Sequence, residues 1–165
     1  MKKYVFVLSI AALVVVLDQV TKWYIRHSIG LYDSVAVIDS LFHITYVRNS
    51  GGAFGLLAGT NRALRLPFFL LVSGAAVGAL LFFVRRVEPR RRLLLFALGA
   101  ILGGALGNLV DRMISGEVTD FLDVHWHGYH WPAFNVADSC ITTGMVVLLV
   151  YSLIVKDEPQ ASSRT

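Results

Sequence analysis

Four long apolar runs constrain this chain more than any other feature. They lie at about residues 4–24, 64–84, 93–110 and 138–155. A helix rises 1.5 Å per residue, so about 20 residues cross a hydrocarbon core roughly 30 Å thick. Backbone polar groups inside lipid must be hydrogen-bonded within their own segment, which favours helices. The sequence therefore predicts an all-α membrane protein with four transmembrane helices, in one domain over residues 1–165 with a polar tail at 156–165.

The composition agrees with a protein whose main solvent is lipid. Of the 165 residues, 56% are hydrophobic and 16% are charged, and the mean hydropathy is +0.64. The first run follows Lys2 and Lys3, as in a signal peptide, but it continues to 18–22 without a small-residue cleavage pattern, so we expect it to be retained. The net charge of +4 comes from short basic clusters between apolar runs. Membrane orientation explains these clusters better than nucleic-acid binding does, and we expect no nucleic-acid partner.

The basic clusters also predict which way the helices run. The positive-inside rule places Lys/Arg-rich loops in the cytoplasm. Both termini and the loop between the second and third runs then lie inside, and segments 25–63 and 111–137 lie outside. The basic residues that carry this prediction are Lys2, Lys3, Arg85, Arg86, Arg90, Arg91, Arg92 and Lys156.

The two outer segments differ in character. The first has β-prone stretches at 34–38 and 41–47, bounded by turn residues, which predict a small extracytoplasmic hairpin or sheet between the first two helices. The second is rich in aromatic rings, which suits a surface at the level of the lipid headgroups. Its rings belong to Phe121, Trp126, Tyr129, Trp131 and Phe134.

Glycines recur every four residues in two of the runs. Gly99, Gly103 and Gly107 do so in the third run, and Gly74 and Gly78 in the second. Such spacing is typical of close contacts between membrane helices. We expect packing at these positions and no chemistry.

Polar residues gather near the outer ends of the helices, where lipid should exclude them. Charged groups at membrane depth are costly and mark candidate functional sites. By helix direction they fall at one depth, so a single polar site is possible. Asp18 with Lys22, and Asp111 with Arg112, are expected to form ion pairs that orient neighbouring helices. The remaining members of this set are Asn108, Asn135 and Asp138.

Asp120 and Asp138 differ from these pairs, because neither has a basic residue within one helical turn in sequence. Asp138 opens an apolar helix and has an equally good interpretation as a helix N-cap. Two partly desolvated carboxylates would share a proton, so that one activates water and the other donates to a scissile carbonyl. That is the logic of an aspartic protease.

A metal site is the alternative use of the acidic residues. His125, His127 and His130 lie near Asp120 and Asp123, but their spacing matches no compact zinc pattern. We expect these histidines to be polar tips at the membrane interface. Cys140 is the only cysteine, which leaves no paired-cysteine motif.

Two further classes of protein compete with a protease. A small transporter or channel would spread its polar groups across the bilayer, whereas here the strong groups lie toward one side. A scaffold that binds other membrane helices through its glycines would leave Asp120 and Asp138 without a purpose.

Five stretches carry a resemblance to a known family. They lie at 18–22 (DQVTK), 48–54 (RNSGGAF), 103–112 (GGALGNLVDR), 118–121 (VTDF) and 132–139 (PAFNVADS). In order, spacing and topology the chain resembles lipoprotein signal peptidase, the bacterial signal peptidase II family of membrane aspartic peptidases.

This resemblance implies a function. The expected reaction removes the signal peptide from diacylglyceryl-modified prolipoproteins, on the amino side of the lipidated cysteine. It implies a multi-pass protein among the lipids of the bacterial cytoplasmic (inner) membrane, with its active site at the outer face. It also implies no metal or organic cofactor, and inhibition by globomycin.

The resemblance also implies residue roles. The catalytic pair falls on Asp120 and Asp138. Supporting roles fall on Asp18, Lys22 and Asp111. The residues expected to line the substrate or inhibitor site are Asn49, Asn108, Arg112 and Asn135. Beside this, the residues themselves suggest that Gly51 permits a sharp turn that lets Asn49 hold the peptide backbone.

Overall fold

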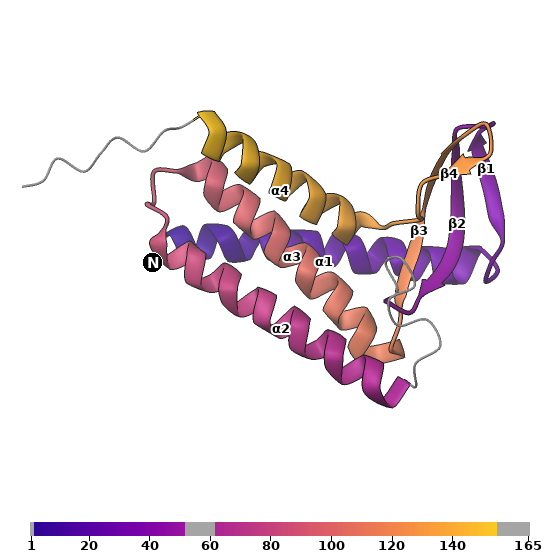
Figure 1. Cartoon of the computed structure of the whole chain (residues 1–165), viewed down its shortest axis with the longest axis horizontal. Coiled ribbons are helices and arrows are strands. Elements are labelled where there is room, and N and C mark those ends of the chain that lie inside the picture. Colours follow the sequence, from indigo (N-terminus) through magenta and orange to yellow (C-terminus); the bar gives the residue numbers. More distant parts are fainter. Residues whose placement is uncertain (1, 52–61, 155–165) are drawn as a thin grey trace, which may run out of the picture.

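Four long helices form the body of the protein (Figure 1). The computed structural model describes residues 2–51 and 62–154. The helices are α1 (Lys2–Ser28), α2 (Arg62–Arg86), α3 (Arg92–Ser115) and α4 (Val136–Ile154). All four are long and apolar enough to cross a membrane. The predicted four-helix membrane fold is therefore confirmed.

The helices extend beyond the apolar runs that predict them. α1 continues four residues past its run to Ser28, and α3 continues to Ser115. Polar groups near these ends contact the protein: Arg26 of α1 pairs with Asp111, and Ser115 of α3 bonds to the carbonyl oxygens of Asp111 and Glu117. α3 stops at Gly116, which has φ 79° and donates its backbone N–H to the carbonyl of Arg112.

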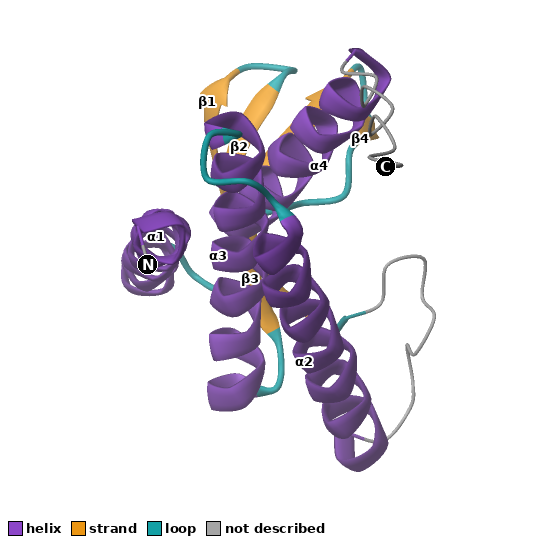
Figure 2. Cartoon of the chain, turned by 90° about the vertical axis from the view of Figure 1, so that its left-hand side faces the viewer, coloured by secondary structure: helices purple, strands orange, loops and turns teal. Residues whose placement is uncertain are grey.

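The central element of the bundle is α3. It packs against each of the other three helices, and in Figure 2 it lies between α1 and α2. Most of its middle is buried, whereas α2 and α4 expose many large apolar side chains. Those exposed faces suit lipid.

Glycines explain how closely α1 approaches α3. A Cβ added at Gly103 would lie 2.7 Å from the carbonyl oxygen of Ala11, closer than real atoms allow. The predicted seam in the third run is therefore confirmed. The predicted seam in the second run is wrong, because no atom of the described residues lies within 4 Å of a Cβ added at Gly74 or Gly78.

A four-stranded antiparallel sheet stands at one end of the bundle. Its strands are β1 (Ser34–Ile38), β2 (Phe42–Asn49), β3 (Val118–Trp126) and β4 (Tyr129–His130), in the order β1-β2-β3-β4. The hairpin predicted between the first two helices is confirmed. The sheet is larger than predicted, because β3 and β4 come from the second connecting segment.

The second connecting segment, residues 111–137, was predicted to form an aromatic surface at headgroup level, and it does so only in part. Trp126, Tyr129 and Trp131 are exposed. Phe121 is 5% exposed and packs with Ile25 and Tyr46 between the sheet and α1. The headgroup-level interpretation is therefore wrong for Phe121.

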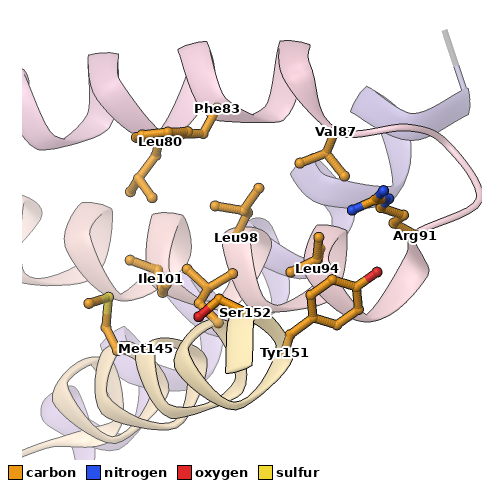
Figure 3. A pocket seen from close by; sticks show the side chains of 11 residues that line it. Leu80, Phe83, Val87, Arg91, Leu94, Leu98, Ile101, Met145, Tyr151 and Ser152 are labelled. Carbon is orange, nitrogen blue, oxygen red and sulfur yellow. The ribbon is translucent and has the colours of Figure 1, made fainter. Parts of the chain in front are cut away.

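Away from the sheet, an apolar cavity of about 500 Å³ opens between α2, α3 and α4 (Figure 3). Its lining includes Phe83 of α2, Leu98 of α3, and Met145 and Tyr151 of α4. Met145 is seven residues from Asp138, or about 10 Å along the helix. The cavity thus follows α4 away from the helix start.

Candidate active site

Asp120 lies on β3 and is 2% exposed. Its Oδ1 accepts a hydrogen bond of 2.6 Å from Asn135 Nδ2, and its Oδ2 accepts one of 2.8 Å from Asn49 Nδ2. Burial raises the pKa of Asp120 to about 6; the Asn49 and Asn135 amides lower it, and the negative charge of Asp138 raises it. Asp120 is therefore a buried carboxyl that holds its proton into the weakly acidic range.

Asp138 lies in the first turn of α4, where it forms a reciprocal cap with Asn135. Its backbone N–H donates to Asn135 Oδ1 at 2.9 Å, and its Oδ2 accepts the backbone N–H of Asn135 at 3.3 Å. This is the geometry of a capping box, with Asn135 as the N-cap and Asp138 three residues later. The other oxygen, Oδ1, accepts a bond of 2.8 Å from Asn108 Nδ2.

Asn135 joins the two carboxyls. It is fully buried, its Nδ2 donates to Asp120, and its backbone N–H donates to Asp138 Oδ2. The same Nδ2 lies 3.3 Å from both Asn108 Oδ1 and the carbonyl oxygen of Thr119. The structure thus brings together Asp120 and Asp138, which the sequence singles out, around one residue, Asn135.

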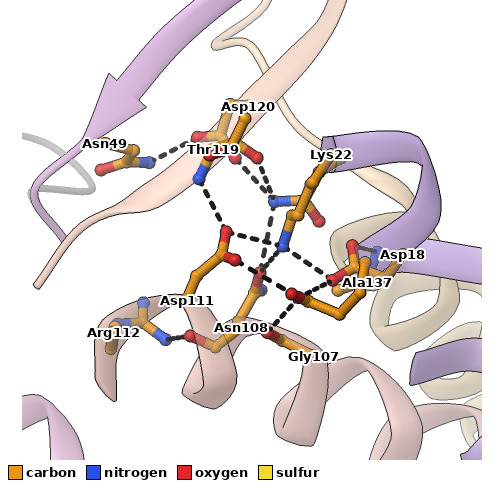
Figure 4. Close-up of polar contacts among 12 residues, drawn as sticks. Asp18, Lys22, Asn49, Gly107, Asn108, Asp111, Arg112, Thr119, Asp120 and Ala137 are labelled. Atoms are coloured by element: carbon orange, nitrogen blue, oxygen red, sulfur yellow. Dashed lines mark hydrogen bonds and ion pairs between the residues drawn. The ribbon is translucent and has the colours of Figure 1, made fainter. Parts of the chain in front are cut away.

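Lys22 supports this arrangement from α1 (Figure 4). It is 0% exposed, and its Nζ contacts Asp18 at 2.8 Å, Asn108 Oδ1 at 3.0 Å and Asp111 at 3.2 Å. An ammonium beside Oδ1 fixes the orientation of the Asn108 amide, so that its Nδ2 faces Asp138. The expected pair of Asp18 with Lys22 is confirmed, and Asp18 Oδ1 also accepts the backbone N–H of Ala137 at 3.0 Å.

Asp111 has different partners from those expected. Its Oδ1 pairs with Arg26 Nη2 at 2.7 Å, and its Oδ2 accepts the backbone N–H of Thr119 at 2.9 Å besides contacting Lys22. The expected pair of Asp111 with Arg112 is wrong: between the two, the described structure has no salt bridge. Neighbouring residues on a helix point about 100° apart, so Arg112 faces elsewhere.

Arg112 packs its guanidinium over the ring of Phe69 on α2, 5.1 Å from the centroid. Its Nη1 lies 3.5 Å from the carbonyl oxygen of Asn108. In the described residues no carboxylate forms a salt bridge with it, and its expected role in binding stays a prediction.

Gly51 sits at the turn that follows β2. It has φ +94°, which favours glycine, and its backbone N–H donates to Asn49 Oδ1 at 2.9 Å. This bond holds the Asn49 amide with its Nδ2 toward Asp120. The rest of the 48–54 motif, from Gly52 onward, lies outside the described residues.

Sequence reasoning missed three members of the polar group. Arg26 Nε donates to Thr119 Oγ1 at 2.9 Å, and Gln19 Nε2 lies 3.1 Å from the carbonyl oxygen of Gly107. Asp18, Lys22 and Arg26 recur every four residues, and that spacing is the signal that would have added Arg26.

The metal alternative built on Asp120 does not fit the structure. Both Asp120 oxygens accept amide hydrogen bonds. Side chains alternate along a strand, so Asp123 and His125 point to the other face of β3. His125 is also 7% exposed, so the expectation of a polar tip at the membrane interface is wrong for it.

Comparisons with known proteins identify a family. A family model described as signal peptidase (SPase) II matches residues 10–154. Lipoprotein signal peptidase of Geobacter sulfurreducens is 53% identical over 82% of this chain and 83% of its own. Lipoprotein signal peptidase of Syntrophotalea carbinolica is 50% identical, over 87% of this chain and 88% of its own.

Solved structures give the same result at the level of the fold. A bacterial membrane enzyme structure is 36% identical to this chain, with a TM-score of 0.79, and the match covers 92% of this chain and 94% of that one. The family model covers most of the chain, including every residue described around Asp120 and Asp138. On the sequence, the fold and this buried polar group together, the chain belongs to the signal peptidase II family.

Proposed function

We propose that this protein is a lipoprotein signal peptidase, an aspartic endopeptidase with Asp120 and Asp138 as its catalytic pair. Its reaction removes the signal peptide from diacylglyceryl-modified prolipoproteins, on the amino side of the lipidated cysteine. One observation carries the proposal: Asn135 bonds to Asp120 through its side chain and to Asp138 through its backbone. Two carboxyls held this way can work on one peptide bond.

The pKa of Asp120 suggests how the two carboxyls divide the work. A pKa near 6 favours a protonated Asp120 more than an ordinary aspartate. The N-terminal end of α4 and the Asn108 amide meanwhile offer donors to a negative Asp138. In this scheme Asp138 takes a proton from water and Asp120 donates one to the scissile carbonyl oxygen.

Collapse of the resulting tetrahedral intermediate breaks the C–N bond. The proton taken by Asp138 passes to the leaving nitrogen, and Asp120 recovers its own as the new carboxyl forms. Proton transfers between two carboxyls and one water balance this reaction.

The substrate would approach from the bilayer. Its signal helix is apolar, and the cavity between α2, α3 and α4 begins about 10 Å along α4 from Asp138. We place the apolar part of the signal peptide along this cavity, with the scissile bond at the start of α4. Asn49 and Arg112, beside the pair, would contact the peptide backbone or a globomycin-type inhibitor.

Chain direction supports an orientation in the bacterial cytoplasmic membrane. The start of α1, the α2–α3 connection and the end of α4 lie together, opposite the sheet (Figure 1). With the Arg-rich connection inside, both termini are cytoplasmic and the aspartates lie at the outer face.

The test measures cleavage of a purified, lipidated prolipoprotein by the full chain in detergent or lipid. Asp120→Asn and Asp138→Asn keep the side-chain volume and remove the ionisable carboxyl. Each should lower the rate by a factor on the order of 10² to 10⁴. Asp39→Asn is the matched control, because Asp39 is exposed in the turn between β1 and β2.

Asp120→Asn and Asp138→Asn must both remain folded, as judged by helical circular dichroism and elution as a single species. Cleavage at the wild-type rate by either folded variant would contradict the catalytic assignment. Loss of cleavage in the Asp39 variant would show that the assay reports general damage.

A further inference from the structure

Three histidines and one aspartate meet on the sheet, away from the aspartate pair. His43 on β2 is the register partner of Asp123 on β3, and His125 on β3 is the partner of His130 on β4. Because Asp123 and His125 are two apart on one strand, they share a face. The cross-strand partners bring His43 and His130 to the same face.

The side chains converge as the register requires. One ligand atom each from His43, Asp123 and His125 lies within 4.8 Å of the other two. The ring of His125 is 4.3 Å from that of His43 and 4.5 Å from that of His130, centroid to centroid. His130 Nδ1 lies 2.9 Å from Asp123 Oδ1 and 3.0 Å from Oδ2.

One nitrogen in this cluster is unsatisfied. His125 is 7% exposed, and its Nδ1 is buried with no hydrogen-bond partner in the part of the chain that the structure describes. A buried polar atom without a partner costs about 1–3 kcal/mol. β3 lies between β2 and β4, so His125 has an imidazole on either side.

We propose that His43, Asp123 and His125 bind one transition-metal dication of the Zn²⁺ class. Imidazole nitrogens and a carboxylate oxygen are ligands that such cations prefer. Tetrahedral ligands at about 2.0–2.1 Å from zinc lie about 3.3 Å apart, so small side-chain rotations close the present spacing. His130 holds the Asp123 carboxylate as an outer partner of the kind that orients metal ligands.

A metal-free histidine cluster is the alternative, and it explains less. A structural cluster accounts for the stacked rings and for the bond between His130 and Asp123. It leaves His125 Nδ1 without a partner, whereas a cation gives that ring a ligand bond.

The proposed ion would act on the sheet and not on the peptide bond. It would join β2 to β3 directly and β4 through His130. Asp120 lies three residues before Asp123 on β3, and its side chain points to the opposite face. Failure of this proposal would leave the peptidase assignment untouched, since neither carboxyl of the aspartate pair is a ligand.

The experiment titrates Co²⁺ into untagged, chelator-stripped full chain in detergent and follows d–d absorption, with Zn²⁺ as competitor. We expect one equivalent to bind with tetrahedral absorption that Zn²⁺ abolishes. His43→Asn should lose at least tenfold in affinity, and His130→Asn should lose about 10- to 100-fold as an outer partner. His127→Asn is the matched control: His127 is exposed in the β3–β4 turn, and asparagine tolerates its φ of 48°.

Thermal unfolding without metal shows whether each variant is folded, and His43→Asn is preferred because His125 is buried. Added Zn²⁺ should raise the melting temperature of the wild type and of His127→Asn but not of His43→Asn. Absence of saturable binding in the wild type would overturn the proposal. Equal Co²⁺ affinity in a folded His43→Asn variant would overturn it as well.

Discussion

Two groups of acids lie side by side in this protein, and they are held by different partners; Asp18, Asp111 and Asp120 are buried, and Asp138 is half-buried. Asp18 and Asp111 contact the cations of Lys22 and Arg26. Asp120 and Asp138 accept hydrogen bonds from amides and, among the described residues, form no salt bridge. The first group joins α1 to α3 through ion pairs. In the second group no cation pairs with Asp120 among the described residues, and burial raises its pKa to about 6.

The largest effect is expected from removing Lys22, the cation that Asp18 and Asp111 share. Lys22→Met leaves Asp18 and part of the charge on Asp111 uncompensated inside the protein. Breaking a buried pair in this way costs about 3–5 kcal/mol. We expect the largest drop in melting temperature among these variants, measured in detergent.

Arg90→Gln is the control for Lys22→Met. Arg90 pairs with Glu88 in an exposed position, where pairs contribute about 0–1 kcal/mol. An equal drop in both variants would show that burial of Lys22 is not what makes its pairs important.

The second prediction concerns pH and the stability of the Asp120 variant. The folded-state pKa of Asp120 is raised from 3.8 to about 6, so its contribution to stability is complete below pH 3.8 and is lost as pH rises through 6. Asp120→Asn should therefore gain stability relative to wild type between pH 4 and pH 8, by at most about 3 kcal/mol. Melting temperatures of both proteins across that range provide the measurement, and a constant difference would contradict the raised pKa.

A third variant disturbs the ion-paired group without touching a charge. A Cβ at Gly107 would lie 2.6 Å from Asp18 Oδ2. Gly107→Ala should therefore cost about 1–3 kcal/mol through overpacking. In Gly74→Ala the new Cβ meets no atom of the described residues within 4 Å, so it should not destabilise α2. Similar losses of stability in the two variants would remove the packing argument.

The smallest effect is expected from removing one of the amides that hold Asp120. Asn49→Ala removes one donor from Asp120, and that hydrogen bond lowers the pKa of Asp120. We expect a further rise in this pKa and about a tenfold loss in rate, equal to one lost transition-state interaction of about 1.4 kcal/mol. If the limb of the pH–rate profile that reports Asp120 does not move toward higher pH, the hydrogen bond from Asn49 does not lower the pKa of Asp120.

The helices and the first hairpin were predictable because their signals are local. An apolar run of spanning length predicts a membrane helix wherever it packs. The ends of α1 and α3 were missed because charged residues stand there, and two of them, Arg26 and Asp111, pair with each other across 85 residues of sequence. Gly74 and Gly78 show the reverse: four-residue spacing does not by itself make a seam, because the partner helix decides whether one exists.

The site was predictable in its members more than in its contacts. Asp120 and Asp138 stood out because no nearby cation accounts for them. Lys22 was expected to pair with Asp18 alone, and its bond to Asp111 depends on how α3 meets α1. His43 could not be joined to Asp123 from sequence, because the strands that pair them are about eighty residues apart.

Under the proposed function, the capping box at the start of α4 makes catalysis depend on the order of one helical turn. Asn135 caps that helix and bonds to both acids, so fraying of this turn would separate the two carboxyls while the rest of the bundle stays intact. Enzyme activity should then be lost at a lower temperature than the helical circular dichroism signal. Inhibitors that contact both acids should stabilise this turn.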